Sequence, residues 1–280
     1  MRRSFPPRLT AGLSCLLAMT KSPSRIVVKF GSGILANARG TALDEKQFAR
    51  LAAEIAGLVK AGHECVIVSS GAVAAGLAEL GLKERPEDLP SKQACAAIGQ
   101  SKLMQLYGAM FAPHGLVVAQ LLLTYRDLDS RVSHTNVQNT FRRLFAQKHV
   151  VPIINENDCV AVEELGKFGD NDKLSAEVAV LVKADTLILL TSVDGLLDAD
   201  GKVVRVVEDI AAVAGLARQE KGKFSVGGMI SKLQAVKVAV EAGIATHIAS
   251  GRKAGRIPGI VAGKALGTRF VAHKAVAKGS

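Results

Sequence analysis

The 280-residue sequence contains no tryptophan, and aromatic residues make up only 4% of it. A protein that binds single-stranded nucleic acid by stacking bases on aromatic side chains has few such platforms at this composition. The four cysteines, Cys15, Cys65, Cys95 and Cys159, lie far apart, without a C-x-x-C motif or histidine pairs at ligand spacing. They indicate neither a structural zinc site nor a redox motif, and they favour a reduced, cytoplasmic protein.

Long apolar runs are also missing, because none reaches the roughly 18 residues that a membrane span needs. Residues 1–20 begin with basic residues and a short apolar stretch, as a signal peptide does, but Thr10 and Ser14 interrupt it and no A-x-A site follows. We therefore expect no membrane association and no export. The sequence predicts an N-terminal extension over residues 1–24, unstructured or upstream of the true start, and a single domain over residues 25–280.

Acidic residues are absent from both ends of the chain. Residues 1–25 carry five Arg or Lys and residues 242–280 carry seven, whereas the other 24 basic and 25 acidic residues nearly balance. The formal net charge of +11 therefore resides in the two ends. Charge of this kind more often gives weak, non-specific attraction than a specific site, so we expect no specific nucleic-acid partner. A nucleic-acid-binding protein remains the alternative that the basic ends motivate.

What the sequence does contain, from Arg25 onward, is a regular alternation of short β-branched runs and longer helical patterns. Most of the short runs are continuously apolar, which is typical of strands covered on both faces of a parallel sheet. The alternation predicts an α/β protein, a three-layer α/β/α sandwich with an open, mostly parallel central sheet. The predicted strands are Ile26–Phe30, Cys65–Ser69, Val117–Leu122, Val150–Asn155, Thr186–Thr191 and Thr246–Ser250, and the predicted helices are Asp44–Ala61, Ser91–Phe111, Ser133–Lys148, Asp172–Lys183 and Met229–Ala242.

Residues 193–228 depart from this alternation, with a turn signal followed by a predicted short strand, Val203–Val207, and a loop rich in glycine and lysine. In open α/β sheets, ligands bind outside the carboxyl ends of the strands. The segments that follow each strand are therefore the candidate functional site.

The first strand leads into Lys29–Ala36, K-F-G-S-G-I-L-A, which contains the G-x-G-x-x-A pattern of dinucleotide-binding proteins. The next helix is expected only at about Asp44, and the second strand ends in Ser69-Ser70-Gly71 without an acid for a ribose, so this interpretation lacks its context. A lysine beside a glycine loop suits phosphate oxygens instead. Because Lys29 lies in an otherwise apolar strand end, it needs an anionic partner.

Polar clusters follow two further strands. The second strand leads into S-S-G-A at residues 69–72, which suits an anion at a helix N-terminus or is a plain N-cap. The fourth ends in N-E-N-D at residues 155–158, and G-D-N-D at residues 169–172 opens the next helix. Asn and Asp are common in turns, but two such clusters at one sheet edge favour a polar substrate pocket. Residues 225–232 add a glycine loop with a second lysine, while Walker A and H-R-D-type kinase motifs are absent.

Five blocks occur in this order over about residues 25–270: K-F-G-S-G, S-S-G-A, I-N-E-N-D, G-D-N-D and G-G-M-x-x-K. Together they resemble the amino acid kinase family, and within it the branch that phosphorylates the side-chain carboxylate of L-glutamate. The resemblance implies ATP with Mg²⁺, the product L-glutamyl 5-phosphate and the first step of proline biosynthesis in the cytoplasm. It also implies a homo-oligomer, proline as a feedback inhibitor and hand-off of the unstable product to glutamyl phosphate reductase. No metal ligand from the protein itself is indicated.

The resemblance also implies roles for individual residues. Lys29 and Lys232 would contact the transferring phosphoryl group, and Asp172 would organise the two lysines. Ser70, Asp158, Asn171 and Asp170 would form the glutamate site. The nucleotide would be bound by Lys29, Thr191, Ser192, Val226, Gly227, Gly228, Met229, Ile230, Ser231 and Lys232.

The chain departs from the family pattern at two places and leaves alternatives open. Thr191-Ser192 stands where the family usually has Thr-Asp, and Val226 stands where it has Thr, so the preference for ATP over GTP is not determined. The sequence ends at Ser280 without the PUA module of many bacterial members. Acetylglutamate kinase, uridylate kinase and a non-catalytic sensor are the alternatives; the acidic residues Asp158 and Asp170 favour a free ammonium on the acceptor, and the paired lysines argue against a sensor.

Overall fold

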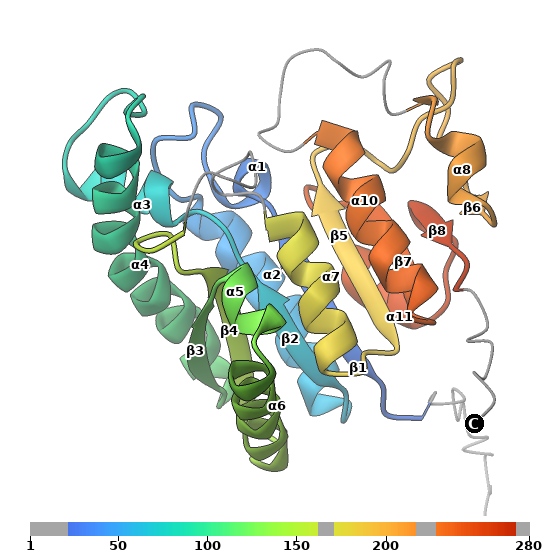
Figure 1. The fold of residues 1–280 in the computed structure, drawn as a ribbon, viewed down its shortest axis with the longest axis horizontal. Coiled ribbons are helices and arrows are strands. Elements are labelled where there is room, and N and C mark those ends of the chain that lie inside the picture. Colours follow the sequence, from blue (N-terminus) through green and yellow to red (C-terminus); the bar gives the residue numbers. More distant parts are fainter. Residues whose placement is uncertain (1–21, 162–170, 217–227, 273–280) are drawn as a thin grey trace, which may run out of the picture.

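The computed structural model describes residues 22–161, 171–216 and 228–272. They form an eight-stranded sheet with helices on both faces (Figure 1), in the strand order β3-β4-β2-β1-β5-β7-β8-β6. This confirms the predicted α/β/α sandwich. The strands are β1 Arg25–Phe30, β2 Glu64–Val68, β3 Val117–Leu123, β4 Val150–Glu156, β5 Thr186–Thr191, β6 Val206–Val207, β7 Ala245–Ser250 and β8 Thr268–Phe270.

Neighbouring strands pair in parallel along the run β3-β4-β2-β1-β5-β7, so the carboxyl ends of these strands share one edge of the sheet. All six long strands predicted from the sequence are present. The predicted strand Val203–Val207 is shorter in the structure, because only Val206–Val207 joins the sheet while Val203 forms an isolated bridge with Leu197. Strand β8, which pairs antiparallel with β7, was not predicted, since three residues are too few to show a period.

The five predicted helices are present as α2, α4, α6, α7 and α10, whereas the short helices α1, α5, α8 and α11 were not predicted. The sequence predicted no helix before about Asp44, but a single turn, α1, begins at Ser32, directly after Gly31, which follows β1. Its four residues lie below the length that periodicity can reveal. The helices are α1 Ser32–Leu35, α2 Glu45–Lys60, α3 Ala72–Glu79, α4 Leu89–Phe111, α5 Tyr125–Asp129, α6 Arg131–Ala146, α7 Asn171–Leu181, α8 Ile210–Val213, α10 Gly228–Glu241 and α11 Arg256–Val261, with a 3₁₀ turn at Ala112–His114.

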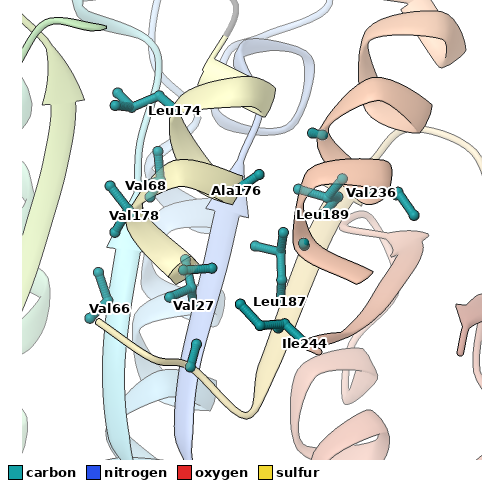
Figure 2. Packing of buried hydrophobic residues seen from close by; sticks show 14 of the residues in the cluster. Val27, Val66, Val68, Leu174, Ala176, Val178, Leu187, Leu189, Val236 and Ile244 are labelled. Carbon is teal, nitrogen blue, oxygen red and sulfur yellow. The ribbon is translucent and has the colours of Figure 1, made fainter. Parts of the chain in front are cut away.

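Two apolar cores separate the three layers. On one face, α6, α7 and α10 cover the sheet, and Figure 2 shows Val27 and Leu187 of the strands packed beneath Ala176 and Val236 of the helices. On the other face, α2, α4 and α11 pack against Ile26 and its same-face neighbours. Because side chains alternate along a strand, the face of β1 that holds Val27 also holds Lys29.

In the described part of the chain, no helix combines the length and apolar character required to span a bilayer.

Helices α3 and α4 cross unusually closely at two glycines. A Cβ atom built on Gly76 would lie 1.9 Å from the carbonyl oxygen of Cys95, and one on Gly99 would lie 1.8 Å from that of Ala72. Only a residue without a side chain fits at either position. The crossing fixes α4 against the helix that follows the S-S-G-A block.

Candidate active site

Three charged side chains meet at the carboxyl edge of the sheet and are almost completely buried. Lys29 lies at the end of β1, Asp172 in the first turn of α7 and Lys232 one turn into α10, with exposed fractions of 5%, 0% and 6%. The two carboxylate oxygens of Asp172 lie 2.6 Å from Lys29 Nζ and 3.0 Å from Lys232 Nζ. The anionic partner that Lys29 needs is therefore Asp172, as buried charges require.

The electrostatics of this trio leave a net positive charge. Burial raises the pKa of Asp172, but the two ammonium groups outweigh burial and hold the pKa at about 2. The hydroxyl of Ser231 also donates to Asp172, over 3.1 Å. One ionised carboxylate therefore holds two lysines, and the trio keeps one surplus positive charge at the carboxyl edge of the sheet.

Apart from Lys29, those predicted nucleotide residues that the structure describes lie at the end of β5 and in the first turns of α10. Thr191 ends β5 and its carbonyl accepts from Gly251 N at 2.8 Å, while Ser192 is exposed. Gly228 begins α10, and the side chain of Met229 packs in the core, so any contact of Met229 with a nucleotide has to come from its backbone. Ile230 is exposed in the same turn. The remaining predicted site residues, Asp170, Val226 and Gly227, lie outside the described residues.

Asn171, beside Asp172, connects the substrate-side residues. Its amide nitrogen donates to Asn155 Oδ1 at 2.7 Å, to Ser70 Oγ at 3.4 Å and to the carbonyl of Ser69. The structure thus places Ser70 and Asn171 together although they are 101 positions apart in the chain. The amide oxygen of Asn171 is buried, and it has no hydrogen-bond partner among the described residues.

Asp158 supplies a second buried and unsatisfied oxygen. It lies two positions after β4, is 8% exposed, and its Oδ1 finds no hydrogen-bond partner in the described ranges. Burial raises the pKa of this carboxyl to about 6, an effect that the charge of Arg85 partly offsets. Asp158 lines a small pocket together with Gln100 and Cys159. A carboxylate in such a place is suited to a cationic group of a ligand.

Sequence reasoning missed two residues of this region. Gln100 of α4 hydrogen-bonds Asn155, whose role was not recognised although it lies within the I-N-E-N-D block. Nothing in the helical pattern of α4 distinguishes Gln100, because its partner is 55 positions away. The glycine at position 99 is the one local signal of a close approach there.

The model of the amino acid kinase family matches residues 24–250. The chain belongs to this family. Amino acid kinases similar to it include the glutamate 5-kinases of Thermus thermophilus, 47% identical over 90% of this chain, and of Dehalococcoides mccartyi, 44% identical over 88%. The chain spans 69% and 68% of the length of these two relatives. The family resemblance drawn from the five blocks is confirmed.

Solved structures with low sequence identity to this chain share the fold. The UMP kinase of Bacillus anthracis is 16% identical, with a TM-score of 0.59 over 90% of this chain and 98% of its own. An N-acetylglutamate synthase of Neisseria gonorrhoeae, complexed with coenzyme A and N-acetyl-glutamate, is 15% identical, with a TM-score of 0.64 over 90% of this chain and 60% of its own. At these identities the likeness concerns the amino acid kinase fold alone.

Proposed function

We propose that this protein transfers the terminal phosphoryl group of ATP to the side-chain carboxylate of L-glutamate, which yields L-glutamyl 5-phosphate and ADP. The observation that carries the proposal is the buried trio, in which Asp172 holds Lys29 and Lys232 at 2.6 Å and 3.0 Å at the ligand-binding edge of the sheet. Relatives at 42–47% identity that bear the name glutamate 5-kinase support the choice of acceptor.

The chemistry of this transfer needs cations more than it needs a base. A glutamate side chain with a reference pKa of about 4.3 is already ionised at neutral pH, so no residue has to remove a proton from it. Phosphoryl transfer passes through a loose transition state with negative charge on the equatorial oxygens. Lys29 and Lys232 neutralise that charge and let one anion approach another, each contributing about 2–4 kcal/mol. Asp172 keeps both ammonium groups in place without reorganisation.

The unsatisfied oxygens on the other side of the site suit the free α-ammonium of an amino acid. Asp158 provides a carboxylate, and Asn171 provides an amide oxygen whose own nitrogen is fully engaged. An acetylated amine carries no positive charge and only one N–H, so it would leave the Asp158 carboxylate buried and unpaired. We therefore propose L-glutamate rather than N-acetylglutamate as the acceptor, with Ser70 and Asp170 as further contacts.

The nucleotide site is proposed at Thr191, Ser192 and the loop and first turn over Val226–Lys232. Magnesium would enter with the nucleotide, because Mg²⁺ in such enzymes is held largely by the phosphates of the substrate. The exposed Ser192 replaces an acid of the family pattern, so the base preference has to be measured with ATP and GTP side by side.

The wider biological predictions rest on the same proposal. They are a role in the first step of proline biosynthesis in the cytoplasm, a homo-oligomer, inhibition by proline and hand-off of the product to glutamyl phosphate reductase. Hand-off follows from the chemistry, since an acyl phosphate hydrolyses in water. A coupled assay in which the reductase gains no rate from this protein beyond that given by free product would contradict it.

The decisive experiment traps the acyl phosphate as its hydroxamate, with L-glutamate, N-acetylglutamate and aspartate as acceptors in parallel. We expect product with L-glutamate, and a loss of about 10²- to 10³-fold in kcat for Lys232→Met, because one charge at the transferring group disappears. The matched control is Lys237→Met on the same helix, where the lysine is two-thirds exposed and lies 3.9 Å from Glu241. Activity with N-acetylglutamate instead, or equal rates for the two variants, would refute the proposal.

A further inference from the structure

Four side-chain amides, joined by hydrogen bonds, connect the buried site to the edge strand β3. We call Asn171, Asn155, Gln100 and Gln120 the amide chain. The nitrogen of Asn171 donates to Asn155 Oδ1 at 2.7 Å, that of Asn155 to Gln100 Oε1 at 2.8 Å, and that of Gln100 to Gln120 Oε1 at 3.2 Å. The two middle amides, Asn155 and Gln100, therefore each accept from the inner neighbour and donate to the outer one.

The direction of the amide chain is set by backbone groups that cannot turn around. Asn155 Oδ1 accepts from the backbone N–H of Glu156 at 3.0 Å, which forces the Asn155 nitrogen to point away, toward Gln100. The carbonyl of Ser69 accepts from the Asn171 nitrogen in the same way. If the Asn155 amide were reversed, its nitrogen would face two donors, and a buried amide does not tolerate that arrangement.

The inner end of the amide chain is buried and the outer end is not. Asn171 and Asn155 are 2% and 3% exposed, Gln100 is half-buried, and Gln120 lies exposed on the edge strand β3. Gln100 is therefore the acceptor that satisfies the nitrogen of Asn155 inside the protein. Its position is fixed by the close crossing of α3 and α4 at the preceding residue, Gly99.

We propose that Gln100, acting through Asn155, is a positioning residue that holds the Asn171 amide with its oxygen directed at the acceptor substrate. This inference rests on the proposed function, in which that oxygen accepts a hydrogen bond from the substrate ammonium. Without an oxygen at position 100, the Asn155 nitrogen has no buried partner and its side chain turns toward another acceptor. Asn171 then loses its closest side-chain hydrogen-bond acceptor, and the direction of its amide oxygen is no longer fixed.

The test measures steady-state kinetics with the acceptor that the wild type phosphorylates. For Gln100→Met, which keeps the length of the side chain but removes its hydrogen bonds, we expect KM for the acceptor to rise about tenfold, the value of one hydrogen bond to a charged group. KM for ATP should stay unchanged. Gln100→Glu retains an oxygen for Asn155 and lets the exposed Gln120 turn to donate, so it should restore the acceptor KM.

Two controls separate positioning from a general loss of structure. Gln105→Met makes the same replacement at an exposed position of α4, and Gln120→Met removes only the exposed end of the amide chain; neither should change either KM. If Gln100→Met is too unstable to assay, Asn155→Ser interrupts the amide chain at the next residue. It should likewise raise KM for the acceptor and leave KM for ATP unchanged. An unchanged acceptor KM in Gln100→Met, or an equal rise in both KM values, would overturn the positioning role. If the wild type phosphorylates a different acceptor, the proposed function is wrong, but the KM values of the variants can still be compared with that acceptor.

Discussion

At the scale of single residues, burial determines which charges the protein can keep and what they can do. Asp172 is fully buried yet ionised, because Lys29 and Lys232 each contact one of its oxygens. Asp158 is buried without such a partner, and its pKa rises to about 6. Two carboxyls on the same sheet edge thus have opposite shifts, one suited to holding cations permanently and one suited to receiving a cation from a ligand.

The first residue-scale prediction concerns the pH dependence of acceptor binding. The Asp158 carboxyl of the free protein is ionised above its pKa of about 6 and neutral below it, so attraction for the substrate ammonium is lost as the pH falls. We expect kcat/KM for L-glutamate to fall about tenfold per pH unit below 6. The measurement is a pH–rate profile at saturating ATP, with kcat/KM for L-glutamate determined in steps of about one pH unit from about pH 5 to about pH 8.

The control for this profile is Asp158→Asn, which has no carboxyl to titrate. It should show a low kcat/KM for L-glutamate and no step near pH 6, because Asp172, with a pKa of about 2, does not change charge in this range. A profile of the wild type that stays flat down to pH 5, or a variant that keeps the step, would show that another group is responsible.

The second residue-scale prediction is that Asp158→Asn stabilises the ligand-free protein. Because the folded-state pKa lies above the unfolded value, the favourable contribution of Asp158 is present at low pH and is lost as the pH rises through 6. At pH 7.5 the wild type therefore bears the cost of a buried charge, which a difference of about two pKa units places at roughly 3 kcal/mol. Urea unfolding at pH 7.5 should show the variant to be more stable, and the difference should shrink at pH 4.5. A less stable variant, or a difference independent of pH, would contradict this reading.

At the scale of elements, the site depends on how closely helices approach each other and the sheet. The crossing of α3 and α4 at Gly76 and Gly99 brings Gln100 to the end of β4, where Asn155 and Asp158 lie. Helices α7 and α10 begin at the edge where β1 ends, so their first turns deliver Asp172 and Lys232 to Lys29 (Figure 1). The two halves of the site meet at α7, which carries Asn171 and Asp172 side by side.

The element-scale prediction is that Gly99→Ala separates α3 from α4. The added methyl group would lie 1.8 Å from the carbonyl oxygen of Ala72, so the helices must move apart, and we expect a loss of about 1–3 kcal/mol in the free energy of unfolding. Gly108→Ala, on the same helix, is the matched control, because its Cβ would meet nothing within 4 Å. It should be neutral or stabilising by about 0.5–1 kcal/mol. Chemical denaturation of both variants checks this, and equal stabilities would show that the crossing tolerates a side chain.

At the scale of the whole molecule, the surplus positive charge is separate from the proposed catalytic residues. The ends of the chain carry the excess, while the sequence between them is close to neutral. A phosphate-binding site therefore does not account for the net charge of +11, since the buried trio itself adds a single positive charge. We therefore expect any long-range attraction of polyanions to be independent of phosphoryl transfer.

The whole-molecule prediction concerns nucleic acid. We expect any affinity for duplex DNA to fall steeply with salt and to be the same for unrelated sequences, because only counterion release contributes. Fluorescence anisotropy with two duplexes, at salt concentrations between about 50 and 200 mM, measures both properties. A preference for one duplex that persists at the higher salt concentration would favour the nucleic-acid-binding alternative.

The sequence alone was enough for the architecture and for the sheet edge at which the polar and charged residues of the blocks gather. Continuous apolar strands such as Thr186–Thr191 and the strict alternation with helices specify a parallel sheet, and parallel strands place their carboxyl ends at one edge. The need of Lys29 for an anionic partner could likewise be read from its apolar surroundings. Short elements such as α1 and β8 were not predicted, because a single turn or three residues contain no measurable period.

Only the tertiary structure decided which polar groups meet and which remain unsatisfied. That Asp172 contacts both lysines, that Met229 packs into the core and that Gln100 supports Asn155 all depend on side-chain directions between segments far apart in the chain. Hydrogen bonds between such segments have no local pattern, because each partner is chosen by how the layers pack. The periodicity of the sequence therefore determined the sheet edge at which the candidate site lies, and the packing of α4, α7 and α10 against the sheet decided how its residues are held.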